Sequence, residues 1–221
     1  MDIDQFVQTV AIYALPVLFA ITLHEAAHGY VARHFGDMTA YAQGRISLNP
    51  ARHIDLMGTI VVPIAILALS KLAGGAGLLF GWAKPVPVNY SALRRPRQNM
   101  LWVAAAGPGA NLAMALGWTL LLKIFLALPD NYFSTPMRMM CQAGMEVNVI
   151  LMLLNLLPIL PLDGGRIVAS LLPSRMAWGY AKLEPWGFPI LLLLLFVGAL
   201  GLILAPMVDF SFRVLGTLFQ I

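Results

Sequence analysis

The stretch from Phe6 to Leu23, FVQTVAIYALPVLFAITL, contains no charged residue and is long enough to cross most of a bilayer's hydrocarbon core. His24, Glu25 and His28 follow at once, in the sequence LHEAAHGY. A charged side chain in a membrane span costs about 2.5–3.5 kcal/mol on insertion scales, so ionisable residues in spans generally have a function. We therefore expect a membrane-spanning helix that carries a functional site near its end.

Further apolar stretches indicate that the chain crosses the membrane several times. The sequence of 221 residues is 60% hydrophobic and 11% charged, whereas a soluble domain carries about 25% charged residues. The pattern predicts an all-α polytopic membrane protein with about four to six transmembrane helices. The expected spans cover residues 6–35, 100–128, a stretch from about 139 that ends in NLLPILPLDGGR at 155–166, and 190–204, and the tail from 206 is expected to form an amphipathic helix at the membrane surface.

The basic residues predict how the chain is oriented. Lys and Arg gather in three regions, at 33–52, 84–97 and 166–182, whereas the N-terminus has none and the 128–138 connection has only Arg138. By the positive-inside rule, the three basic regions are cytoplasmic. The net charge of +4 is explained by basic loops that orient the chain in the membrane, so no nucleic-acid partner is expected. The single cysteine, Cys141, excludes an intrachain disulfide and a cysteine metal cluster.

The segment between the first two basic regions cannot make one full crossing, because both of its ends lie on the same side. Ser70-Lys71 and Gly74-Gly75 interrupt its apolar sequence, which favours a re-entrant hairpin. Irregular backbone at membrane depth is tolerated where protein buries it or where it lines a wet cavity. The following residues, FGWAKPVPVN, are expected to be extended because prolines disfavour helix.

The HEAAH sequence has the spacing of a metal site. In a helix, His24 and His28 lie on one face and can bind one ion, with Glu25 beside them to take a proton from water. Catalytic zinc sites use three protein ligands and keep a fourth position open. Asp163, in LPLDGGR, is the best third candidate, because it ends an apolar span and Gly164-Gly165 allows a sharp turn beside the metal.

Three motifs together resemble one known family. HEAAH in a first span, GPGAN opening a later one and NLLPILPLDGG ending the next are similar to the site-2 protease family of intramembrane zinc metalloproteases. The similarity extends from about residue 11 to residue 166. GRISLNPARHIDLMGT and FGWAKPVPVN resemble the compact bacterial branch, and the chain has no room for a PDZ or CBS domain.

The resemblance implies a function and assigns roles to residues. One Zn²⁺ is held by His24, His28 and Asp163, Glu25 is the general base, and Asn155 helps to hold the substrate or the oxyanion. The implied protein is a single integral-membrane peptidase domain, residues 1–221, with its catalytic core at about 11–166 and a C-terminal span and amphipathic tail at 186–221. The zinc lies within the membrane, toward the cytoplasmic side of a bacterial cell membrane.

The implied partners are the lipid bilayer and a substrate protein or peptide with a transmembrane segment. A helical peptide bond is shielded by its own hydrogen bonds, so the substrate must unwind, and residues 80–89 are expected to offer it a strand edge. The sequence does not identify the substrate or the oligomeric state.

Alternatives remain open at several polar positions and for the whole protein. Asn155 is also compatible with a hydrogen bond between helices. Asn111 is interpreted as a helix-packing residue beside Gly107 and Gly109, and Glu146 and Asn148 as packing or interfacial residues. A metal-ion transporter would also place His, Glu and Asp in a membrane. A catalytically silent protein that binds membrane peptides is the other alternative.

Overall fold

A computed structural model describes residues 3–53, 55–62, 65 and 84–221 of the chain. The described residues are mainly helical, and four helices are long and apolar enough to cross a membrane. These are α1 (Ile3–His34), α4 (Pro96–Ala127), α5 (Ser134–Asn155) and α9 (Ala199–Phe219). The prediction of a polytopic helical membrane protein is confirmed. The expected re-entrant hairpin falls mostly on residues 63–64 and 66–83, which lie outside the described residues.

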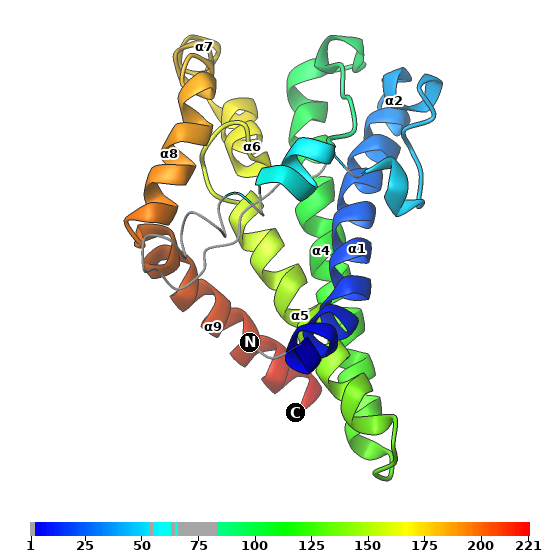
Figure 1. The fold of residues 1–221 in the computed structure, drawn as a ribbon. Coiled ribbons are helices and arrows are strands. Elements are labelled where there is room, and N and C mark those ends of the chain that lie inside the picture. Colours follow the sequence, from blue (N-terminus) through cyan, green and yellow to red (C-terminus); the bar gives the residue numbers. More distant parts are fainter. Residues whose placement is uncertain (1–2, 54, 63–64, 66–83) are drawn as a thin grey trace.

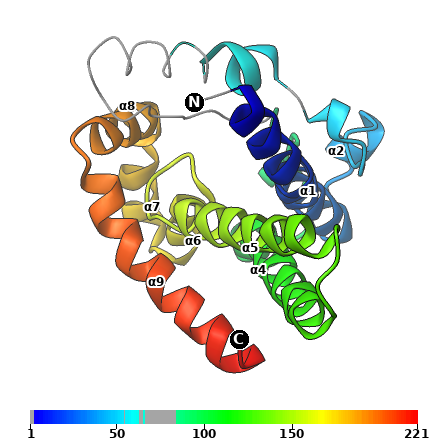
Figure 2. The same ribbon diagram turned by 60° about the horizontal axis from the view of Figure 1, so that its bottom comes forward.

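Three of the long helices form the bundle that positions the site. Helix α4 packs along both α1 and α5, and α1 also crosses α5 (Figures 1 and 2). The short helix α6 (Asp163–Leu171) lies against α4 on the opposite side from α1. Helices α8 (Glu184–Phe196) and α9 form an arm beyond α6, and α9 returns to α5 through a core that contains Val149, Leu153 and Leu215.

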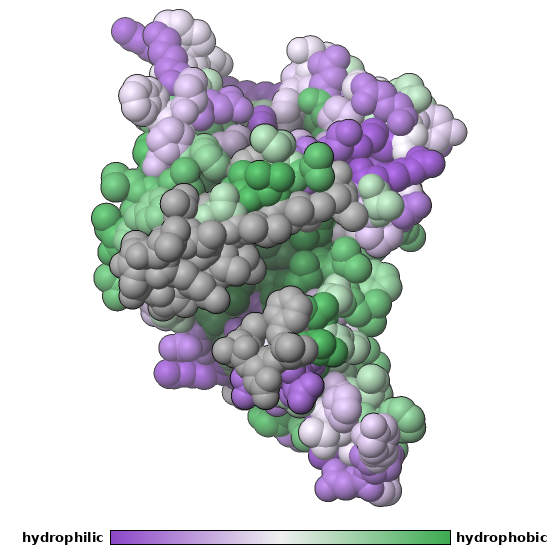
Figure 3. All heavy atoms as spheres, in the orientation of Figure 1, coloured by the Kyte–Doolittle hydropathy of each residue, from purple (hydrophilic) through white to green (hydrophobic). Residues whose placement is uncertain are grey.

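The remaining short elements gather at one end of the bundle. They are α2 (Thr39–Ala42), the turns η1 (Pro50–Arg52), η2 (Leu56–Val61) and η3 (Tyr90–Ala92), and α7 (Ser174–Ala181). Helix α2, the start of α4 and helix α7 all lie at the upper end in Figure 1, whereas the 128–133 connection lies at the lower end. The three basic regions thus share one end, as their charge predicts. Figure 3 shows hydrophilic residues toward both ends, with a hydrophobic band between them.

The C-terminal region differs from the expected span over 190–204. Helix α8 ends at Phe196, and Gly198 adopts a left-handed conformation with φ +74° before α9 begins. Such a conformation is available to glycine without steric cost. Pro206 lies inside α9 without ending it, which membrane helices tolerate. The predicted span is therefore divided, and the predicted amphipathic tail is part of a long apolar helix.

Candidate metal centre

His24, His28 and Asp163 come together although 135 or more residues separate the histidines from the aspartate in sequence. The Nε2 atoms of the two histidines lie 3.1 Å apart. Asp163 Oδ2 lies 3.2 Å from Nε2 of His24 and 3.3 Å from Nε2 of His28. All three residues are at most 9% exposed. In the part of the chain that the structure describes, they form the one cluster with metal-ligand spacing.

Each histidine is oriented through its other ring nitrogen. Nδ1 of His28 lies 2.7 Å from the carbonyl oxygen of Val103, and Nδ1 of His24 lies 2.6 Å from Oδ1 of Asn111. An oxygen acceptor at Nδ1 places the proton on that nitrogen and leaves a lone pair on Nε2. Both Nε2 lone pairs therefore face Asp163, which is the arrangement that metal-binding histidines use.

This donor set fits zinc. Asp163 Oδ2 is buried and has no hydrogen-bond donor among the described residues, so the three facing atoms are all acceptors. Such atoms repel one another unless a cation lies between them. A tetrahedral zinc site with bonds of about 2.0–2.1 Å places neighbouring ligand atoms about 3.3–3.4 Å apart. The observed separations of 3.1–3.3 Å are close to these values.

Gly107 of α4 leaves the space that this site needs. A Cβ atom at position 107 would meet Nε2 of both histidines, closer than side chains tolerate. Gly109, two residues further along α4, has no atom within 4 Å of the corresponding position. The two glycines of the GPGAN sequence therefore differ, since only Gly107 faces the histidines.

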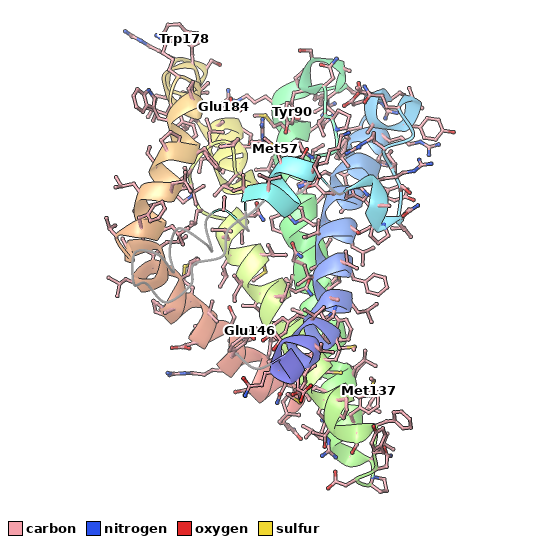
Figure 4. The ribbon with its side chains drawn as sticks, in the orientation of Figure 1. Met57, Tyr90, Met137, Glu146, Trp178 and Glu184 are labelled. Carbon is pink, nitrogen blue, oxygen red and sulfur yellow. The ribbon has the colours of Figure 1, made fainter. Side chains whose placement is uncertain are left out.

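Asp163 is positioned by the packing of α6. Gly164 and Gly165 are helical, and a Cβ atom on either would collide with the backbone of residues 156–160. The predicted reason for these glycines, a sharp turn, is therefore wrong: they allow close packing. On the outer side of α6, Arg166 Nη2 lies 3.4 Å from Glu184 Oε1, and its guanidinium lies 5.1 Å from the ring centre of Tyr90. Figure 4 shows Tyr90 and Glu184 at this end of the molecule.

Glu25 lies between the two histidines in sequence and is held by a different segment. The backbone N–H of Val86 donates a hydrogen bond of 2.7 Å to Glu25 Oε2. Val86 belongs to the 84–89 segment, which has neither helix nor strand structure. The carboxylate is only partly buried, so one oxygen is fixed while the group stays close to the metal ligands.

The remaining predicted residues take other positions. Asn155 Nδ2 donates to Leu151 O of its own helix, at 2.9 Å, and among the described residues it makes no hydrogen bond to His24, His28 or Asp163. His53 is buried, and its Nε2 lies 2.8 Å from Ser47 O. Asn148 is fully buried, which excludes the interfacial alternative and leaves packing. Glu146, labelled in Figure 4, is partly buried. It accepts a hydrogen bond from the Tyr13 hydroxyl.

Known proteins are similar in sequence to this chain over most of its length. "Putative zinc metalloprotease YwhC" of Bacillus subtilis is 38% identical over 199 residues, which cover 88% of this chain and 84% of that protein. The sequence model of peptidase family M50 matches residues 124–198, a range that includes Asp163. The chain belongs to peptidase family M50. The resemblance to site-2 proteases is thus confirmed.

Two further M50 relatives carry a similar name. "Putative zinc metalloprotease Rip2" of Mycolicibacterium smegmatis is 32% identical over 83% of this chain and 66% of that protein. The protein of the same name from Mycobacterium tuberculosis H37Rv is 31% identical over 76% of this chain and 54% of its own length. No solved structure matches the chain significantly. Zinc is the cofactor of family M50, and the donor set described above fits it.

Proposed function

We propose that this M50 protein is an intramembrane zinc endopeptidase that hydrolyses peptide bonds within transmembrane segments. The observation that supports this most strongly is the triangle of His24 Nε2, His28 Nε2 and Asp163 Oδ2, formed by residues of helices with apolar surfaces. The basic loops at the same end favour an active site that opens toward the cytoplasm of a bacterial cell.

Each residue has a distinct proposed role. His24, His28 and Asp163 hold one zinc ion, which when bound activates water and polarises the scissile carbonyl. Glu25 takes a proton from the attacking water and gives it to the leaving amine. The hydrogen bond from Val86 holds the Glu25 carboxylate in one orientation during both transfers.

The 84–89 segment, the described part of the predicted 80–89 strand edge, is the proposed contact for the unwound substrate. Most of its backbone N–H groups are already used, so it offers fewer hydrogen bonds than a free strand edge would. Lys84 N–H donates to His53 O, Val86 N–H to Glu25 and Asn89 N–H to Asp37. Pro85 and Pro87 have no N–H. Val88 therefore has the one N–H group in this segment without a partner among the described residues. Arg45 Nη2 already donates to the carbonyl oxygens of Lys84 and Pro85, so a substrate strand would bind mainly through the carbonyl oxygens of residues 86–88.

Asn155 keeps its proposed role as a polar contact for substrate or oxyanion. Its Nδ2 uses one hydrogen atom for Leu151 O, which leaves a second N–H and the amide oxygen for a ligand. If this role is correct, Asn155→Leu lowers the cleavage rate and leaves zinc content unchanged.

The experiment that tests the function compares metal content and cleavage. The protein is purified without chelator, its zinc per chain is measured, and it is reconstituted with a single-span peptide in vesicles. We expect about one zinc per chain, cleavage within the span, and no cleavage by Glu25→Gln, which should keep its zinc.

Two results would count against the proposal. Zinc retained at full affinity by Asp163→Ala would show that the third ligand is wrong. Zinc flux across the vesicle membrane without peptide cleavage would instead support the transporter alternative.

A further inference from the structure

A chain of hydrogen bonds connects His24 to the middle of α5. His24 Nδ1 lies 2.6 Å from Asn111 Oδ1, Asn111 Nδ2 donates to Asn148 Oδ1 at 3.0 Å, and Asn148 Nδ2 donates to Gly144 O at 2.8 Å. Both asparagines have no exposed surface. One buried chain of polar groups therefore crosses α1, α4 and α5, and it ends on a backbone carbonyl.

The backbone carbonyl at the end fixes the direction of every bond in the chain. A carbonyl oxygen accepts hydrogen bonds and cannot donate them. Gly144 O must therefore face the NH₂ group of Asn148, which turns the oxygen of Asn148 toward Asn111. That oxygen in turn attracts the NH₂ group of Asn111, which also lies 3.4 Å from Ala20 O. The oxygen of Asn111 is then left to face His24.

The direction of the chain determines which nitrogen of His24 can bind zinc. An oxygen facing Nδ1 requires the proton there and leaves the lone pair on Nε2, the atom that lies 3.2 Å from Asp163 Oδ2. If Asn111 were rotated, its NH₂ group would face Nδ1 and favour the proton on Nε2. A protonated Nε2 cannot be a metal ligand.

We infer that Asn148 is a positioning residue for the zinc site: through Asn111, it keeps the Nε2 lone pair of His24 directed at the metal. This inference rests on the zinc-binding role proposed above for His24. Asn148 touches neither the metal ligands nor the proposed substrate contact, and it acts only by fixing the orientation of the Asn111 amide. Packing alone would not require two asparagines here, because a leucine fills a similar volume without a buried amide.

The test measures zinc affinity by competition with a chelator, using the full chain in detergent. Asn148→Leu removes the acceptor for Asn111, and we expect a loss of affinity of about 10- to 100-fold, the range found when partners of metal ligands are removed. Asn148→Asp should retain most of the affinity, because a buried carboxyl group is held neutral, so that its O–H can donate to Gly144 O while its other oxygen still faces Asn111. Co²⁺ affinity, measured from the absorption spectrum of the bound ion, should rank the variants in the same order as zinc affinity does.

Thr119→Val is the matched control. Thr119 is also fully buried in α4, and its hydroxyl donates to Ala115 O at 2.7 Å, with no contact to the site. Its replacement removes a buried polar group of similar kind, so zinc affinity should stay at the parent value. Equal losses in Thr119→Val and Asn148→Leu would overturn the inference, since they would indicate a general packing effect.

A double variant gives a second test, in which the effect of Asn148→Leu is compared with and without Asn111. Asn148 acts through Asn111, so Asn111→Leu alone and Asn111→Leu with Asn148→Leu should bind zinc equally. A further loss in the double variant, or parental affinity in Asn148→Leu, would refute the inference while leaving the proposed protease function intact. A parent protein that binds no zinc would refute both.

Discussion

The two histidines of the candidate metal centre and the glutamate between them are held by different kinds of structure. His24 and His28 are oriented by buried oxygen atoms of α4, a side-chain amide for one and a backbone carbonyl for the other. Glu25 is instead oriented by the backbone N–H of Val86, in a segment without regular secondary structure. We call the histidines, Asp163 and their helix partners the metal side of the site, and Glu25 with the 84–89 segment the base side. The metal side therefore depends on helix packing and on side-chain identity, whereas the base side depends on the path of a loop backbone.

This difference has a functional consequence. The proposed zinc ligands lie on packed helices, and metal sites tolerate little displacement of their ligands. A general base has to approach water, a substrate and a leaving group in turn, so a partly exposed carboxylate on a loop contact suits it. Substitutions on the metal side should abolish zinc binding, whereas substitutions on the base side should slow cleavage and leave zinc in place.

Gly107→Ala should give the largest effect on the metal side. The new methyl group would occupy the space beside both Nε2 atoms, so we expect zinc affinity to fall by more than about 100-fold, beyond the usual effect of outer partners. Zinc content after dialysis measures this. Gly109→Ala is the control, because no atom lies near its Cβ position. If both variants keep their zinc, the geometry of the site is wrong.

Asp163→Asn should have the next largest effect. It removes the negative charge and weakens the third ligand, while the α6 glycines still pack against residues 156–160. We expect zinc to be bound weakly or not at all, as measured by chelator competition, with helix content unchanged by circular dichroism. Asp130→Asn is the control, since Asp130 pairs with Arg138 at the opposite end of the molecule. Equal zinc affinity in the two variants would contradict the assignment.

Val86→Pro tests the base side. Proline removes the N–H that Glu25 accepts from, in a segment where prolines already stand at 85 and 87. We expect the cleavage rate to fall about tenfold, part of the 10²- to 10⁴-fold that acid–base catalysis contributes, with zinc content unchanged. Val86→Ala keeps the N–H and should cleave at nearly the parent rate. Loss of zinc in Val86→Pro would show that the two sides are not separable.

Much of the metal side could be predicted from the sequence because its chemistry is local. Two histidines at i and i+4 on an apolar helix have few other uses, and the charge-free stretch before them identifies the membrane setting. Asp163 was predicted as the third ligand because it ends an apolar span beside Gly164-Gly165, and the structure brings it together with both histidines. The packing role of Gly164 and Gly165 was not predictable, because the backbone that approaches them is visible only in the fold.

The asparagines and the C-terminal helices show what sequence reasoning lacks. The depth of Asn148 was misjudged, because the crossing of α5 with α1 near Ala20 places it at the centre of the bundle. A usable signal existed: two asparagines in apolar spans, Asn111 and Asn148, must each find a partner. The sequence analysis expects one span over 190–204, whereas Gly198 separates α8 from α9 and Pro206 lies inside α9. Such a break cannot be read from an uninterrupted apolar stretch, because a single glycine is compatible with a continuous helix as well as with a left-handed turn.

Glu184→Gln should give the smallest effect, and it tests whether contacts outside the bundle help to position Asp163. It removes the ion pair with Arg166, which joins α8 to the helix that carries Asp163. Arg166 and Glu184 are 28% and 46% exposed at their side chains, and exposed pairs contribute only about 0–1 kcal/mol. We therefore expect a slight fall in the thermal unfolding midpoint and no change in zinc affinity. A clear loss of zinc would mean that α6 is held in place by α8, and that packing against α4 and residues 156–160 is insufficient to position Asp163.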